Sequence, residues 1–379
     1  MLQRTHMEPY HRCRFLFFPF FILLIFSSCS SSPGKREVNR SYYFWRNSDY
    51  LDSDEKDFLR QHHIKRLYYK VLDIDWSETN HSYPVSINYA EALLSNIYPS
   101  DSLQLDIVPV VFITNKVFQQ ITAAEIPELA KKTLRKCFTR FDDIDSIAEV
   151  SWRFNRYRTT PPFAPAEIQF DCDWTASTAQ KYFSFLEQVK NELRACNTKI
   201  SATIRLHQYK YPEKTGVPPV DRGMLMVYNV SNPTQYNSTN SIFNKETASK
   251  YFTQNKKYDL PLDIALAAYS WGIIYRNKKF YQVENYINEE ELRECSFLKL
   301  SGNNLYTVTV DTVYNELYLR TGDEIKLEKI DETTLMEAAQ LALKALNSDS
   351  LNVSLFELSD NEIKNYRYET IEQVYHHFK

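Results

Sequence analysis

Apolar residues along the chain follow two spacings, one typical of buried strands and one typical of amphipathic helices. Short apolar runs predict strands at 41–45, 67–72, 107–113, 167–175, 200–206, 224–228, 262–271 and 353–358. Longer runs with helical spacing predict helices at 52–62, near 89–97, and at 126–141, 177–195, 334–346 and 371–378. Strands that alternate with helices form parallel sheets, and eight of them close into a barrel. The pattern therefore predicts an α/β fold, a (β/α)8 TIM barrel.

The alternation is interrupted once, after the seventh predicted strand. From about 280 to 331 the pattern is strand-like and contains no helix. Alternating runs at 306–310, 316–320 and 325–328 surround Thr321-Gly322-Asp323. A Gly-Asp pair between alternating runs is typical of a hairpin turn, which would pair the runs on either side. We therefore expect a small β-rich insertion in the barrel, with a hairpin at Gly322.

The amino terminus has the pattern of an export signal. Three arginines within residues 1–14 precede the apolar run Phe15–Phe26, and Ser27-Ser28 then lead into Cys29. A basic region, a short apolar core and small residues make a secretory signal, and the run is too short for a membrane span. Phe26-Ser27-Ser28-Cys29 also resembles a bacterial lipobox, although a cysteine that merely ends a signal peptide is the alternative. We expect a signal peptide at 1–28, a lipid-anchored tether at 29–38 and the barrel at 39–379. These expectations put the protein in a bacterial cell envelope, held to the membrane through Cys29.

Composition excludes several classes of function. The net charge of −3 gives no electrostatic footprint for nucleic acid. Only six glycines are present, and no GxGxxG, P-loop, HExxH or GxSxG motif occurs. We therefore expect no cofactor and no metal site. We also expect a monomer. Four cysteines follow Cys29 without metal or redox spacing, and their pairing is left open, at Cys137, Cys172, Cys196 and Cys295.

The strand predicted at 167–175 carries the strongest functional signal. Its residues alternate between an apolar face and a polar face, and the polar face holds two carboxylates, Asp171 and Asp173, near the strand's end. In a parallel barrel that end carries the chemistry. The alternative is an edge strand with two ordinary surface acids. The apolar face consists of Ile168, Phe170, Cys172 and Trp174, and Gln169 and Thr175 complete the polar face.

These motifs resemble glycoside hydrolase family 18, the chitinase-like barrels. Phe170-Asp171-Cys172-Asp173-Trp174 is similar to the middle of the family's DxxDxDxE motif, and Met226-Val227-Tyr228-Asn229 is similar to its strand-six run. Three positions depart from the family, since Ile168 replaces the first Asp, Thr175 the Glu and Phe356 the strand-eight Trp. In the family that Glu protonates the leaving sugar oxygen, and a threonine hydroxyl is far too weak an acid to do so. The resemblance therefore implies a carbohydrate-binding barrel without chitinase-type catalysis.

A relocated acid would keep the chain an active glycosidase. Glycoside hydrolysis needs two carboxyl groups, about 5–5.5 Å apart for retention or about 6.5–9.5 Å for inversion. Asp171 and Asp173 share one face, and Asp173 could act with Glu357 or with Asp75. The opposite reading is that these acids form a buried polar network with Arg205. A structural or assembly lipoprotein with a vestigial cleft is the third hypothesis.

Residues at the predicted strand ends supply candidate sugar contacts. Aromatic rings stack on the apolar faces of sugars, while polar side chains hold the hydroxyl groups. The aromatic candidates are Trp45, Tyr228, Tyr269 and Trp271. The polar candidates are Asp75, Arg205, His207 and Asn229.

Overall fold

The structure is a computed structural model that describes residues 36–88, 93, 97, 103–138, 165–253, 257–285 and 287–379. Within these ranges no helix is long and apolar enough to cross a membrane. The predicted signal peptide, Cys29 and most of the predicted tether lie outside the described residues. Most of the helix predicted near 89–97 lies outside them as well.

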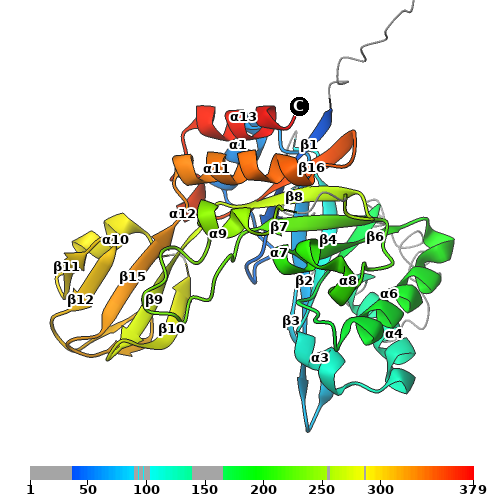
Figure 1. Ribbon diagram of the computed structural model, residues 1–379, viewed down its shortest axis with the longest axis horizontal. Helices are drawn as coiled ribbons and strands as arrows, with labels where there is room; N and C mark the ends of the chain where they lie inside the picture. The colour runs from blue at the N-terminus through cyan, green and yellow to red at the C-terminus, as the bar shows by residue number, and fades with distance from the viewer. Residues whose placement is uncertain are drawn as a thin grey trace, which may run out of the picture. The chain divides into compact units, whose positions relative to one another are not determined.

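Eight parallel strands close into a barrel, which confirms the predicted fold class (Figure 1). Closure comes from β1, which pairs with β16 on one side and with β2 on the other. The strands are short runs of β-branched and aromatic residues, and in β8 every residue is buried. In spatial order they are β1 (Glu37–Phe44), β16 (Ser350–Phe356), β8 (Leu262–Ala267), β7 (Arg222–Val227), β6 (Lys199–Arg205), β5 (Glu167–Asp171), β4 (Asp106–Ile113) and β2 (Arg66–Ser77).

A chain of polar side chains crosses the barrel interior. The Tyr43 hydroxyl on β1 donates to Gln169 Oε1 on β5 at 2.5 Å, and Gln169 Nε2 donates to Ser201 Oγ on β6 at 3.3 Å. Ser201 Oγ donates in turn to Glu167 Oε1 at 2.5 Å, and Arg66 Nη1 on β2 donates to Glu167 Oε2 at 3.0 Å. Buried polar groups are stable when each has a partner. The chain of hydrogen bonds therefore ties four strands together through the middle of the barrel.

One strand is longer than the sequence predicts. β2 continues past residue 72 to Ser77 and returns as the antiparallel strand β3 (His81–Ile87). Ser77 Oγ accepts from the Asn80 amide at 3.0 Å and so stabilises the turn between them. This hairpin extends beyond the barrel at the end where the parallel strands finish.

Helices cover the outside of the barrel. α1 begins with a capping box in which Asp52 and Glu55 satisfy each other's backbone amides, as the acids at 52–55 indicate. α6 buries the stripe that the sequence predicts, including Tyr182, Phe185 and Leu186. The outer helices are α1 (Ser53–Gln61), α3 (Asn115–Gln120), α4 (Ile126–Phe138), α6 (Ala179–Leu193), α7 (Leu206–Lys210), α8 (Pro212–Thr215), α9 (Lys245–Ser249), α11 (Glu332–Ala342), α12 (Asp360–Ile363) and α13 (Tyr368–His377).

The insertion is an antiparallel five-stranded sheet. The single strand predicted at 262–271 is wrong, because β8 ends at Ala267 and β9 begins at Ser270 as part of the new sheet. The predicted hairpin at Gly322 is wrong too, since β15 pairs with β12 and β9 and not with the strand before the turn. The sheet order is β10 (Lys279–Asn285), β9 (Ser270–Arg276), β15 (Glu324–Lys329), β12 (Leu305–Val308) and β11 (Leu298–Gly302). The expectation that this region contains no helix is wrong, because α10 (Glu289–Glu294) forms there, capped by Asn288. The two-stranded pair β13 (Thr312–Tyr314) and β14 (Leu317–Leu319) completes the insertion.

The insertion is fastened to the barrel by the loop that follows β7. In this loop Asn240 Nδ2 donates to the Lys329 carbonyl at 2.8 Å, and the Ser241 amide donates to Glu328 Oε2 at 2.8 Å. On the sheet, the Tyr275 hydroxyl donates to the Pro233 carbonyl in the loop at 2.8 Å. These bonds hold β9 and β15 against the barrel and so fix the position of Trp271 on β9.

Candidate functional site

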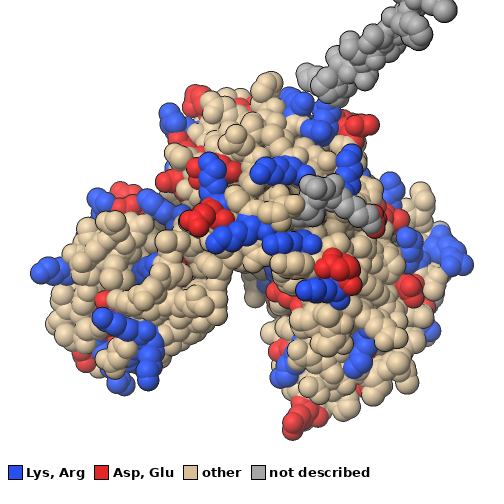
Figure 2. Space-filling view, viewed as in Figure 1, with Lys and Arg blue, Asp and Glu red and all other residues tan. Residues whose placement is uncertain are grey.

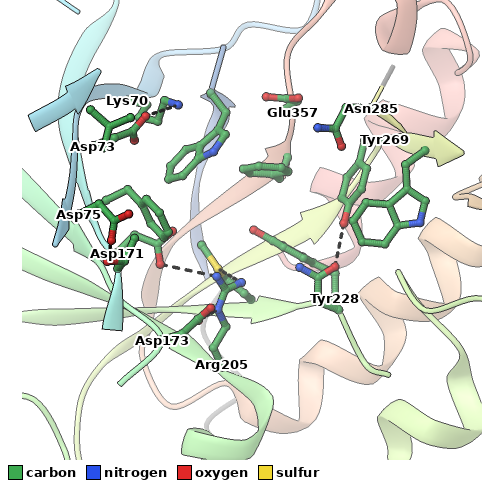
Figure 3. A pocket seen from close by; sticks show the side chains of 18 of the residues that line it. Lys70, Asp73, Asp75, Asp171, Asp173, Arg205, Tyr228, Tyr269, Asn285 and Glu357 are labelled. Carbon is green, nitrogen blue, oxygen red and sulfur yellow. Dashed lines mark hydrogen bonds and ion pairs between the residues drawn. The ribbon is translucent and has the colours of Figure 1, made fainter. Parts of the chain in front are cut away.

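A cavity of about 500 Å³ opens at the carboxyl ends of the barrel strands (Figure 3). Its wall combines residues from the barrel with three from the insertion, Ser270, Trp271 and Asn285. This is the end of the barrel where the sequence places the candidate site. The barrel residues that line it are Trp45, Lys70, Asp73, Ile74, Asp75, Phe112, Thr114, Asp171, Asp173, Arg205, Met226, Tyr228, Phe356 and Glu357, together with Val85, Asn229 and Tyr269 from the adjoining segments.

Arg205 joins the two carboxylates of the β5 motif. Its Nε donates to Asp173, and its Nη2 lies 3.8 Å from Asp171 Oδ1. The Thr203 hydroxyl donates to the same Asp171 oxygen at 2.6 Å. Burial raises the pKa of the Asp171 carboxyl, Arg205 opposes that change, and the neighbouring Asp173 charge adds to it. Asp171 is nearly inaccessible, whereas the Asp173 side chain is 55% exposed, so the two acids occupy different environments.

A second ion pair lies on the β2 side of the cavity. Lys70 Nζ donates to Asp73 Oδ2 at 2.9 Å and lies 5.5 Å from the centre of the Trp45 ring. Two residues along β2, Asp75 Oδ1 accepts a hydrogen bond from the Thr114 hydroxyl at 2.6 Å. That hydrogen bond lowers the pKa of Asp75, which keeps this carboxyl ionised.

Aromatic rings form the opposite part of the cavity wall. The Tyr228 and Phe356 rings stack with their centres 5.5 Å apart, and Tyr269 meets Trp271 edge-on at 5.5 Å. The Tyr269 hydroxyl donates to Asn229 Oδ1 at 2.8 Å, so the candidates from β7, the segment after β8, and β9 act as one unit. Trp271 is held in turn by a 3.0 Å hydrogen bond from its Nε1 to a glutamate of β15.

The Tyr228 hydroxyl is a buried polar group that lines this cavity. The residue is 3% exposed, and its hydroxyl oxygen has no hydrogen-bond partner within the described ranges. Figure 3 shows the ring among Arg205, Tyr269 and Asp171, with the hydroxyl directed away from Tyr269. Burial raises the pKa of Tyr228 well above its ordinary value, so the phenol stays neutral and can both donate and accept. A buried hydroxyl without a partner is costly, and a ligand in the cavity would relieve that cost.

The order of the strands places Glu357 far from Asp171 and Asp173. Glu357 directly follows β16, which lies four strands from β5 in either direction around the barrel. Figure 3 accordingly shows Glu357 beside Asn285, across the cavity from Asp171 and Asp173. Asp75 is closer, because β2 and β5 are separated only by β4.

Two residues that the sequence associates with the site lie elsewhere. His207 does not line the cavity, because β6 ends at Arg205 and the chain turns into α7, which buries Leu206 and exposes His207. The role of His207 as a substrate contact therefore stays a prediction. Thr175 is exposed as well, and its hydroxyl lies 2.9 Å from Ser177 Oγ outside the cavity lining. Trp174 packs on the outside of the barrel, where its ring stacks on Tyr182 at 5.3 Å, as its parity predicts.

Sequence reasoning missed several residues that line the cavity, among them Lys70, Phe112 and Asn285. Lys70 had a signal, since it is the one cation within the otherwise apolar and aromatic run Leu67–Leu72. Asn285 had none, because its position depends on how the insertion folds. Among the described residues no group of three or more His, Cys, Asp and Glu is arranged to hold a metal ion.

Comparisons with known proteins agree with the fold. No protein-family model matches the chain, and no curated protein matches it. Among solved structures it is similar to the C-terminal domain of a "putative chitinase" from Desulfitobacterium hafniense DCB-2, with a TM-score of 0.52 at 10% identity over 91% of this chain and all of that one. It is also similar to catalytic domain 2 of the Group II chitinase of Ostrinia furnacalis, with a TM-score of 0.50 at 9% identity over 90% of this chain and 96% of that one. The chain thus shares its (β/α)8 barrel fold with these two chitinase-type structures.

Proposed function

We propose that the protein binds a carbohydrate in the cavity at the carboxyl ends of the barrel strands, without chitinase-type catalysis. The observation that carries the proposal is the Tyr228 hydroxyl, which is buried, lines the cavity and has no partner within the described ranges. A sugar hydroxyl or amide group would complete its hydrogen bonding.

The remainder of the wall suits the same ligand. Tyr269 and Trp271 offer aromatic edges and faces for the apolar side of a sugar ring. Asp173, oriented by Arg205, offers a carboxylate to sugar hydroxyls. The cavity volume of about 500 Å³ lies within the range of small-molecule sites.

Binding without hydrolysis follows from the exposed threonine at the family's acid position. Thr175 cannot protonate a leaving oxygen, and it is absent from the cavity lining. The resemblance of the Asp171 and Tyr228 motifs to glycoside hydrolase family 18 supports a sugar ligand, and the departure at 175 argues against that family's catalysis.

A glycan array followed by calorimetry tests the proposal. Tyr228→Phe removes only the hydroxyl, and we expect about a fivefold weaker affinity, equivalent to about 1 kcal/mol for one hydrogen bond. Tyr211→Phe is the matched control, because Tyr211 is 38% exposed and does not line the cavity. A complete absence of binding on the array contradicts the proposal and favours a structural or assembly lipoprotein with a vestigial cleft. Equal affinities for the Tyr228 variant and the wild type remove the observation on which it rests.

An active glycosidase is the second candidate, and the environment of Asp171 favours it. Burial raises the pKa of Asp171, which favours a protonated carboxyl in this wall, and Asp173 beside it is an accessible carboxylate. Among the relocated pairs, Asp173 with Asp75 fits best, since β2 and β5 are two strand spacings apart, which amounts to about 10 Å between backbones. Glu357 with Asp173 would have to span the barrel. For this pair we expect inversion, because a strand separation of about 10 Å is nearer to the inverting range of about 6.5–9.5 Å than to the retaining range of about 5–5.5 Å.

A hydrolysis screen on bacterial and host polysaccharides separates the two candidates. If the chain is an inverting glycosidase, Asp173→Asn and Asp75→Asn abolish hydrolysis while Thr175→Ala keeps it, and nuclear magnetic resonance of the first product shows an inverted anomer. Wild-type protein that binds a glycan and leaves it uncut rejects the enzyme.

We further propose that the protein is exported as a lipoprotein anchored through Cys29 in a bacterial envelope. Incorporation of a labelled fatty acid into the wild type, and its loss in Cys29→Ala, is the expected result. Wild-type protein that is exported without the label would leave the signal peptide and refute the lipid anchor.

A further inference from the structure

Carboxylates outnumber cations in the cavity wall. Five acidic side chains line it among the described residues, against the two basic side chains Lys70 and Arg205. Even with Asp171 protonated, four carboxylates face two cations. The five acids are Asp73, Asp75, Asp171, Asp173 and Glu357.

The two cations are already engaged with acids of the same wall. Arg205 bridges Asp171 and Asp173, and Lys70 pairs with Asp73 at 2.9 Å. Asp75, by contrast, accepts its side-chain hydrogen bond from the neutral Thr114 hydroxyl at 2.6 Å, so its charge remains. Asp75 therefore keeps a negative charge that neither Lys70 nor Arg205 pairs with.

The excess is local to the cavity. The whole chain carries a net charge of only −3, and Figure 2 shows acidic and basic side chains interspersed over the face that it draws. A concave site lined by one sign of charge concentrates ligands of the opposite sign. The unpartnered Tyr228 hydroxyl independently marks this cavity as a place where a ligand completes the hydrogen bonding, and a neutral phenol can accept from a cationic donor.

We infer that the ligand is an amino sugar with a free, protonated amine, such as a glucosamine oligomer whose acetyl groups have been removed. This inference rests on the proposed carbohydrate-binding function and narrows its substrate class. The sugar ring meets the aromatic wall of Tyr269 and Trp271, and its ammonium group lies toward the β2 side, where Asp75 is. An N-acetylated sugar carries no charge and gains nothing from the acidic wall.

Calorimetry with four probes tests the inference on the intact mature chain at mildly acidic pH. The probes are a glucosamine tetramer, its fully N-acetylated counterpart, a neutral glucose tetramer and a tetralysine peptide. We expect the glucosamine tetramer to bind at least fivefold more tightly than the N-acetylated one, and to weaken as salt is added. Asp75→Asn keeps the acceptor for Thr114 and removes the charge, and it should weaken the glucosamine tetramer about fivefold more than it weakens the N-acetylated tetramer.

The control is Glu187→Gln on α6, an exposed side chain outside the cavity that undergoes the same change in charge. Equal weakening by both variants would overturn the inference, because the effect would then be a long-range one. Tighter binding of the N-acetylated or neutral tetramer also overturns it, while leaving the proposed carbohydrate binding intact. Tetralysine binding as tightly as the glucosamine tetramer would show that charge alone is recognised and would overturn the assignment to a sugar. Failure of every probe, together with an empty glycan array, contradicts both proposals.

Discussion

Replacing Arg205 by methionine should destabilise the fold in a way that depends on pH. Arg205 is mostly buried and is the cation between Asp171 and Asp173. Removing one partner of a buried ion pair costs about 3–5 kcal/mol, because it leaves a charge without compensation. The Asp173 side chain is 55% exposed and can be hydrated instead, whereas Asp171 is 3% exposed and cannot. We therefore expect the lower end of that range, about 3 kcal/mol of unfolding free energy at neutral pH.

The pH dependence has a definite sign. Burial already raises the pKa of Asp171 above its unfolded value near 3.9, and loss of Arg205 raises it further. A carboxyl whose folded pKa is raised binds more protons in the folded state, so stability falls as pH rises through that window. The gap between wild type and Arg205→Met should be smallest below the unfolded pKa, where Asp171 is protonated in both states, and should widen toward neutral pH.

Urea unfolding at several pH values measures this gap. Arg194→Met removes an exposed arginine on the surface and serves as the control. Arg205→Met/Asp171→Asn should recover much of the lost stability, because the buried charge is then absent as well. An Arg205→Met variant whose loss of stability is the same at every pH would refute the reasoning that Arg205 compensates the charge of Asp171.

Three further predictions follow from the packing. Trp271→Phe removes the 3.0 Å hydrogen bond to Glu328. It should weaken glycan binding about threefold in calorimetry and change the unfolding free energy by less than about 1 kcal/mol. Unchanged affinity would exclude Trp271 from the site. Gly223→Ala places a methyl group 2.9 Å from a side-chain carbon of Ile204 on the neighbouring strand. Thermal unfolding should show a loss of about 1–3 kcal/mol in the free energy of unfolding. A neutral result would mean that β6 and β7 can move apart. Hydrogen bonds from Arg367 lower the pKa of Glu332 to about 2. The contribution of this pair to stability is therefore present above the unfolded pKa near 4.3 and is lost as pH falls toward 2. Titration of the carboxyl carbon by nuclear magnetic resonance should find the low pKa, and a normal value would contradict the prediction.

The barrel could be predicted from sequence because its signal is repeated. Most barrel strands are short runs of apolar residues followed by a helix, so an error at one element leaves the count of eight unchanged. The ends of strands that are set by tertiary contacts are harder to predict from the sequence. Only Ala268 and Tyr269 separate β8 from β9, and both are buried, so no polar residue marks the point where the chain leaves the barrel for the insertion.

Part of the candidate site could also be predicted from the sequence, because it depends on the same regular strand pattern. Because alternate side chains of a strand lie on the same face, Asp171 and Asp173 both line the cavity. Arg205 and Tyr228 line it as well, because each lies at the carboxyl end of a neighbouring strand. Parity fails where the strand stops, which is why His207 faces solvent from α7.

The hydrogen-bonded chain from Tyr43 through Gln169, Ser201 and Glu167 to Arg66 has a consequence for folding. The bonds among Gln169, Ser201 and Glu167 join the neighbouring strands β5 and β6, whereas Tyr43 on β1 and Arg66 on β2 reach these residues only across the closed barrel. A partly closed barrel that buried these side chains without the bonds from Tyr43 and Arg66 would leave polar groups without all their partners. We expect folding of the barrel to be all-or-none, with half-barrel fragments remaining unstructured and circular permutants that keep all eight strands folding normally.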